Sequence, residues 1–190
     1  GNVGIGKDAG DDVTTGSFNI AIGKQALQGG GAVTGDFNIG IGRTTQQAVT
    51  SGTQNHSLGV DSLTSNTTGN YNVALGSSTL RFGTALSNNV AVGVNAGRNT
   101  TSGSNTFIGF EAARTNTSGG SLTAIGSNAL YGNTTGANNI AVGTSTLIAN
   151  TTGSNNVAVG LEAMRNTTGG NSTCIGYKAM REATGSNNVA

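Results

Sequence analysis

The sequence predicts an all-β protein, a parallel β-solenoid of about eleven coils with about 17 residues in each coil. The first observation is the unit Asn-Asn-Val-Ala-Val-Gly at residues 155–160, which recurs almost unchanged at 88–93 and 138–143. The second is its spacing, because seven of the ten intervals between the closing glycines are 17 residues long. A fixed period of this size indicates a repeat architecture. The closing glycines are Gly6, Gly23, Gly42, Gly59, Gly76, Gly93, Gly109, Gly126, Gly143, Gly160 and Gly176.

The third observation is a composition that suits a folded repeat with little charge. Hydrophobic residues make up 34% of the chain, charged residues make up 9%, and the formal net charge is +1. Disordered chains usually combine low hydrophobicity with high net charge, so the ordered apolar period favours folding. The 33 glycines suit short strands joined by many turns.

The residues before each glycine are predicted to form a short strand. The residue directly before the glycine is aliphatic in every unit, and the residue three before it is mostly β-branched. Residues two apart share one face of a strand, so these two columns are predicted to fill the core. Replacing Val159 by Asp should then bury a carboxylate and destabilise the chain. The small residue between the two columns, usually Ala, is predicted to point outward.

A second short strand is predicted after the glycine, followed by a turn rich in Asn, Thr and Gly. Three residues after the glycine the chain is small, and the next residue is often long and apolar, as in Leu27, Leu63 and Leu147. The glycine itself suits a corner that needs positive φ or a close backbone approach. Asn recurs four residues before the glycine, where stacked amides can hydrogen-bond along a column.

Side-by-side association is expected from these columns. An outward Ala column beside an outward Leu column would leave a long apolar strip in water, which monomers rarely expose. The sequence therefore predicts a homotrimer. Both ends of the chain fall inside a repeat unit, so residues 1–190 are expected to be a single repeat array within a longer fibre.

Few residues have the pattern of a chemical site. His56 is the only histidine and stands alone in a strand column, and Cys174 replaces a small Ala as a buried hydrophobe. Asp11, Asp12 and Asp36 are too sparse for a calcium-binding repeat. No catalytic, cofactor-binding or metal-binding residue is therefore expected, and the protein is not expected to be an enzyme. The net charge gives no reason to expect nucleic-acid binding, and no apolar stretch is long enough for membrane insertion in this segment.

One charge pattern is a candidate for ligand or surface contact. An arginine recurs five residues after the glycine and could be solvated, pair with acids such as Glu111 and Glu162, or meet an anionic glycan or lipopolysaccharide. These candidate contact residues are Arg81, Arg98, Arg114, Arg165 and Arg181. Asn-x-Thr/Ser sequons also occur, at Asn66, Asn99, Asn116, Asn133, Asn150 and Asn166. They matter only where secreted proteins are glycosylated.

The repeat resembles a recognised class. The unit Asn-Asn-Val-Ala-Val-Gly followed by x-x-Ala resembles the head repeats of trimeric autotransporter adhesins, whose pattern is close to Asn-Ser-Val-Ala-Ile-Gly-x-x-Ser. It is also similar to longer repeats of phage tail fibres. The resemblance implies a left-handed parallel β-roll, three chains side by side, and an extracellular location on a cell surface or virion. Adhesin-head repeats are shorter, and the extra residues here lie in the Asn-Thr-Thr-Gly turn.

Two functions follow as hypotheses. The first is a structural fibre or shaft segment, a stiff spacer that adheres to cell-surface glycans and continues end to end. The alternative is an ice- or surface-binding solenoid, because turn threonines such as Thr67, Thr134 and Thr151 should stack in regular columns. A flat face of outward threonines would favour that alternative. An acyltransferase of the left-handed β-helix type fits poorly, because its six-residue aliphatic period places Arg98 and Arg114 in the core.

Overall fold

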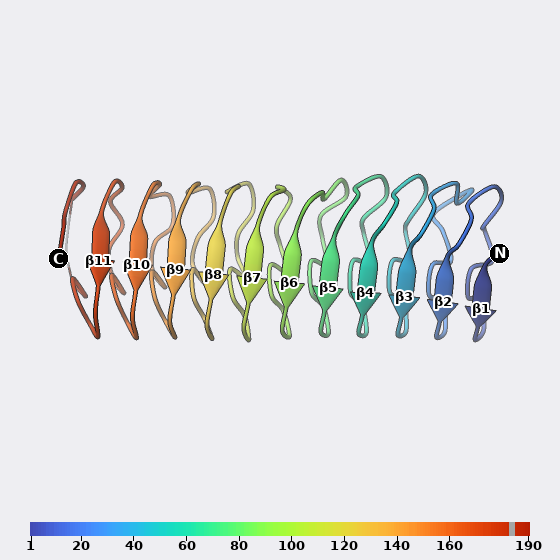
Figure 1. Ribbon diagram of the computed structural model, residues 1–190, viewed down its shortest axis with the longest axis horizontal. Coiled ribbons are helices and arrows are strands. Elements are labelled where there is room, and N and C mark those ends of the chain that lie inside the picture. The colour runs from blue at the N-terminus through green and yellow to red at the C-terminus, as the bar shows by residue number, and fades with distance from the viewer. Residues whose placement is uncertain (183–184) are drawn as a thin grey trace.

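The computed structural model describes residues 1–182 and 185–190 as an all-β parallel solenoid (Figure 1). Within those residues it has no helix, and its eleven strands form one parallel sheet in sequence order, about ten turns from first to last. The strands are β1 (Val3–Ile5), β2 (Ile20–Ile22), β3 (Ile39–Ile41), β4 (His56–Leu58), β5 (Val73–Leu75), β6 (Val90–Val92), β7 (Thr106–Ile108), β8 (Thr123–Ile125), β9 (Ile140–Val142), β10 (Val157–Val159) and β11 (Thr173–Ile175). The predicted parallel solenoid with its 17-residue coil is confirmed.

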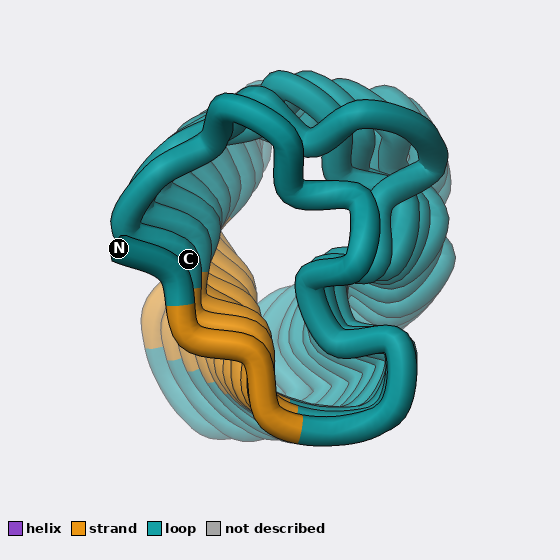
Figure 2. The backbone as a smooth tube through the Cα atoms, turned by 90° about the vertical axis from the view of Figure 1, so that its right-hand side faces the viewer, coloured by secondary structure: helices purple, strands orange, loops and turns teal. Residues whose placement is uncertain are grey.

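Equivalent residues of successive coils lie directly above one another. Ala141 pairs with Ala158, and Val142 pairs with Val159, so each repeat position becomes a straight column along the sheet. Viewed along the axis, the strands occupy one side of the coil, and loops and turns complete it (Figure 2). Any side-chain type that recurs in the sequence therefore becomes a continuous ladder on the molecule.

The strands turn their small residues inward, which is the reverse of the sequence prediction. Ala141 is fully buried, whereas Ile140 beside it is 40% exposed. The inner face is narrow, because a Cβ added at Gly40 would lie 2.2 Å from Cδ1 of Leu27. Phe107 is the one large inner residue of the described strands, and it lies beside Gly97, where an added Cβ would lie 2.5 Å from its ring. The branched aliphatic residues must therefore face outward. The prediction of a core around Val159 is therefore wrong. The expected destabilisation by Val159→Asp no longer follows, because the Val159 side chain faces outward and a carboxylate there would not enter the core.

The chain after each glycine forms turns, not the predicted second strand. In the coil after Gly143 the residues two and four positions on have left-handed backbones, with φ of 56° at Ser145 and 51° at Leu147. Alternating conformations of this kind fold the segment back against the strand and bury Leu147 completely. The apolar core is therefore made by the Ala and Leu columns that were predicted to point outward. Its fully buried large aliphatic residues include Leu27, Leu63, Leu80, Leu86, Leu130, Leu147 and Met164.

The recurring glycine is required at the corner for both predicted reasons. Gly143 has a φ of 133°, which side chains rarely adopt. A Cβ added there would lie 2.5 Å from the carbonyl oxygen of Gly160 in the next coil. Glycine therefore allows the corners of successive coils to stack at backbone contact.

The predicted asparagine column is confirmed as a buried ladder. Oδ1 of Asn72 accepts hydrogen bonds from the backbone N–H of Asn89 (3.1 Å) and from its Nδ2 (3.0 Å). Nδ2 of Asn72 donates to Oδ1 of Asn55 (2.8 Å) and to the carbonyl oxygen of Leu86 (2.5 Å). The Asn72 amide thus links its own coil to both neighbours and finds partners without water. Leu122 and Ser172 interrupt the asparagine column in the later coils.

A second buried column contains four of the sequon asparagines, Asn66, Asn116, Asn133 and Asn150. Nδ2 of Asn133 donates to Oδ1 of Asn116 (2.8 Å) and to the carbonyl oxygen of Gly136 (3.0 Å). Asn66 and Asn150 share this inward position and are equally buried. Glycan attachment at these four sites is therefore incompatible with the folded coil.

Candidate functional site

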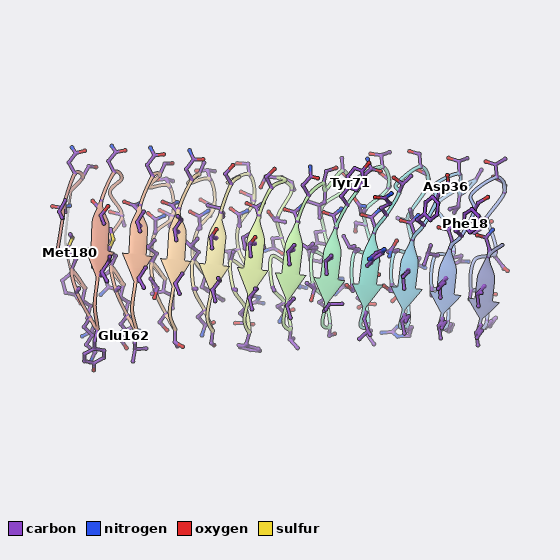
Figure 3. The ribbon with its side chains drawn as sticks, viewed as in Figure 1. Phe18, Asp36, Tyr71, Glu162 and Met180 are labelled. Atoms are coloured by element: carbon purple, nitrogen blue, oxygen red, sulfur yellow. The ribbon has the colours of Figure 1, made fainter. Side chains whose placement is uncertain are left out.

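The main exposed feature is an apolar surface, here called the outward strand face, made by the first and third residues of β1–β11. Leu58 is 52% exposed, Ile108 is 39% exposed and Ile140 is 40% exposed. Because the strands pair in register, these side chains form two columns along the front of the molecule (Figure 3). The column of third residues is aliphatic in every strand, whereas the column of first residues is interrupted by His56, Thr106, Thr123 and Thr173. Ten strand spacings of about 4.8 Å give the face a length of about 48 Å.

Further apolar side chains widen this face at the glycine corner. The residue after the closing glycine is large, apolar and exposed in five coils: Val60, Val94, Phe110, Leu161 and Tyr177. A continuous apolar strip of this length is unusual for a monomer, where large apolar residues are mostly scattered. The surface available for association is therefore the outward strand face, because the predicted Ala and Leu columns are buried.

His56 lies on this face with apolar neighbours. It pairs with Ile39 on one side and Val73 on the other, and its side chain is exposed. Among residues 1–182 and 185–190, no three His, Cys, Asp or Glu side chains come together as a metal site would require. The part of the chain that the structure describes encloses no pocket.

The first three residues of the predicted arginine column lie together in consecutive coils. Arg81 forms an ion pair with Asp61 (3.3 Å), and Arg114 forms one with Glu111 (3.6 Å). Arg98 has no ion pair with any described residue, and its guanidinium lies 4.8 Å from the ring centre of Phe82. Both ion pairs have guanidinium groups about one-third exposed, so each adds little stability. The positive charge left for a ligand is centred on Arg98.

The other two arginines form a separate pair near the C-terminal end. Arg181 contacts Glu162 (3.3 Å) and Glu182 (3.8 Å), so two carboxylates balance its charge. Nε of Arg165 is buried and has no hydrogen-bond partner among the described residues. The five arginines therefore divide into two groups on the surface.

A column of exposed aromatic residues was missed by the sequence analysis. It lies five residues before the glycine and contains Phe18, Phe37 and Tyr71, with the polar Gln54 in the coil between Phe37 and Tyr71; we call these four residues the aromatic column. The rings of Phe18 and Phe37 stack at 5.1 Å with an angle of 6° between their planes. Figure 3 shows Phe18 and Tyr71 beside the start of the strands. The signal was present in the sequence, because Asn or Ser holds this position in the later coils.

The threonine column expected in the turns is present and regular. The Oγ1 of Thr67 donates to the carbonyl oxygen of Thr84 (2.8 Å), and Thr134 donates likewise to Thr151 (2.9 Å). The column comprises Thr14, Thr34, Thr50, Thr67, Thr84, Thr101, Thr117, Thr134, Thr151 and Thr168. Its hydrogen-bonded hydroxyls join one coil to the next.

Cys174 is buried inside the coil as predicted, in place of the usual Ala. Its Sγ donates to the carbonyl oxygen of Ala179 (3.0 Å). Burial raises the pKa of the Cys174 thiol, and the nearby backbone of Met164 opposes this only in part. A buried, protonated thiol is a poor nucleophile. Because the side chain points into its own coil, thiols of adjacent chains would not meet.

Comparisons with protein-family models, with characterised proteins and with solved structures find no match. Among the described residues, no helix has the length and apolar character needed to cross a bilayer. Function must therefore be inferred from the surfaces of the solenoid.

Proposed function

We propose that this chain is a structural segment of an extracellular fibre, formed by three copies packed side by side through the outward strand face. The observation that carries the proposal is the outward strand face, about 48 Å long, whose third-residue column is aliphatic in every strand. Burial of apolar surface is the main favourable contribution to most protein association. Parallel packing of identical columns brings the same apolar residues together in every coil.

The repeat itself supports a stiff spacer. Successive coils are tied together by strand pairing and stacked glycine corners, and a buried amide ladder joins the coils that carry Asn in its column. The resemblance to adhesin-head and phage tail-fibre repeats supports a cell-surface or virion location. The path of the chain in Figure 2 supports the left-handed coil of that resemblance, because it turns counter-clockwise as it recedes from the N-terminal end.

Adhesion to anionic glycans is the second part of the proposal. Arg81, Arg98 and Arg114 are the candidate contacts in the central coils, and Arg165 and Arg181 are those near the C-terminal end. Arg98 is the best placed, since its neighbours Arg81 and Arg114 already pair with carboxylates. A carboxylate or sulfate on a sugar would supply the charge partner that Arg98 lacks among the described residues.

The ice-binding alternative is less well supported. It needs hydroxyl groups that are free to organise water on a flat face. In the threonine column, hydroxyls such as those of Thr67, Thr117 and Thr134 already donate to carbonyl oxygens of the next coil. The regular threonine column is better explained by hydrogen bonds that join the turns of successive coils. The fibre segment therefore remains the preferred function over ice binding.

The test is the mass of the chain in solution. Light scattering should give three times the 18.6 kDa of one chain. The double variant Ile108→Lys/Ile140→Lys places charges on the outward strand face, where the single chain leaves both side chains exposed. It should give a folded chain of 18.6 kDa.

The matched control is Ser51→Lys/Ser118→Lys, which adds the same charge to exposed turns and should remain trimeric. A wild-type chain that stays at 18.6 kDa while folded would refute side-by-side assembly.

A further inference from the structure

We propose that the aromatic column, with the polar groups beside it, is a binding platform for a neutral saccharide. The platform spans four consecutive coils near the N-terminal end and comprises Phe18, Phe37, Gln54 and Tyr71. Phe18 is 59% exposed, Phe37 is 48% exposed and Tyr71 is 56% exposed. Large aromatic side chains held this far in water are usually found where a ligand or partner binds.

The backbone conformation shows that these aromatics are not there for folding. Phe18, Phe37 and Tyr71 all have left-handed backbones, with φ of 59°, 58° and 60°. Bulky residues seldom adopt this region, whereas Asn does so readily. Later coils place Asn or Ser at the same station: Asn88, Ser104, Ser121, Asn138, Asn155, Asn171 and Asn187. The aromatic choice therefore adds strain that a less demanding residue avoids elsewhere.

Burial does not compensate for that strain as it does in the core. Leu80 and Leu130 also have left-handed backbones, but both side chains are fully buried among apolar neighbours. The rings of the aromatic column lose only about half of their exposure. Strained residues that gain little from folding are candidates for function.

The platform is rigid and has polar groups along its edge. The backbone N–H groups of Phe37 and Tyr71 donate to carbonyl oxygens of the preceding coils, at 3.0 Å and 3.1 Å. Asp36 precedes Phe37, and one of its carboxylate oxygens accepts the N–H of Ser17 at 2.6 Å. Figure 3 shows Asp36 near Phe18 at the same edge of the strands. The exposed amide of Gln54 adds a donor and an acceptor between two rings.

This combination matches the chemistry of a sugar. A pyranose has an apolar C–H face that can stack on an aromatic ring and hydroxyl groups at its rim that can bond to carboxylate and amide groups. The aromatic column and the polar residues that precede it contain no Lys or Arg. A phosphate-rich nucleic acid or an acidic glycan would lack a charge partner there, so a neutral saccharide is the occupant that fits.

A second copy of this chain is the competing occupant. The outward strand face runs the whole length of the array. The aromatic column has rings only at Phe18, Phe37 and Tyr71, in the coils near the N-terminal end. An interface along the whole fibre would not need rings restricted to the early coils. The three rings of the platform are about half exposed on the single chain.

The experiment titrates the full chain with cellohexaose, maltohexaose and chitohexaose by calorimetry and by ligand-observed NMR. At least one of these probes should bind the wild-type chain at millimolar or lower concentration. The double variant Phe37→Asn/Tyr71→Asn installs the residue of the later coils, so it should fold at least as stably as wild type. Its affinity for the bound probe should fall by roughly tenfold or more.

The matched control removes an exposed aromatic residue elsewhere. The control variant is Tyr177→Ser, because Ser77 and Ser127 occupy the same position, directly after the closing glycine, in other coils. This variant should bind the probe as tightly as wild type does. The proposal is overturned if none of the three probes binds, or if the double variant binds as tightly as wild type. A double variant that loses chain association without any wild-type sugar binding would also overturn it and assign the column to an interface between copies.

Discussion

Replacing Asn72 by Ala removes one rung of the buried amide ladder, and the structure allows its cost to be worked out. The Asn72 side chain makes four hydrogen bonds: two donated, to Asn55 and Leu86, and two accepted from Asn89. Each buried hydrogen bond contributes about 1 kcal/mol net, so their loss should lower the free energy of unfolding by about 4 kcal/mol. The Asn89 backbone N–H would lose its acceptor, which adds to the cost.

Chemical denaturation followed by circular dichroism, at one fixed protein concentration, measures this difference. The matched control is Asn166→Ala, because Asn166 is exposed and its side chain donates one described hydrogen bond, to Glu182 at 2.8 Å. Its loss should cost less than about 1 kcal/mol. If Asn72→Ala lowers the free energy of unfolding by no more than the control does, the ladder is not a major source of stability and the reasoning fails.

Two further predictions test the buried side of the strands. Ala141→Leu should lower the free energy of unfolding by about 1–3 kcal/mol, because the buried position would be overpacked. Ile140→Leu on the outward strand face should change the free energy of unfolding by less than about 1.5 kcal/mol. Equal effects in chemical denaturation would show that the strand does not turn Ala141 inward and Ile140 outward. Because burial raises the pKa of the Cys174 thiol, the unfolded chain should lose its proton first as the pH passes the ordinary thiol pKa. Stability should therefore fall from there up to the folded-state pKa, and Cys174→Ala should remove that fall in melting curves measured against pH.

The outward strand face and the aromatic column have different patterns along the array, and we propose different partners for them. The strand columns repeat in every coil, so they suit contact with an identical chain. The aromatic column interrupts the repeat at Phe18, Phe37 and Tyr71, where Asn or Ser would satisfy the backbone better. Departures from a repeat that bring strain without burial are therefore the places to seek ligand binding on such a fibre.

Sequence alone determined the parts of this protein that depend on period. Eleven copies of one unit specify the solenoid, its coil length and the strand before each glycine, because residues at equal intervals must stack in equal positions. The glycine corner and the Asn ladder could also be predicted, since each depends on a local property of the residue. The arginine column was visible for the same reason, although the pairing of Arg81 with Asp61 was not.

Only the tertiary structure decided which face of each strand is inside. Alternation divides a strand into two faces, but it does not say which face a narrow coil can enclose. Here the left-handed residues after each glycine fold the chain back and bring side chains such as Leu27 against the strand, so the inner position is small in nearly every strand. The large Phe107 fits there beside Gly97, where an added Cβ would lie 2.5 Å from the Phe107 ring. The larger Val and Ile side chains must then lie outside, where they form the surface on which the proposed function depends.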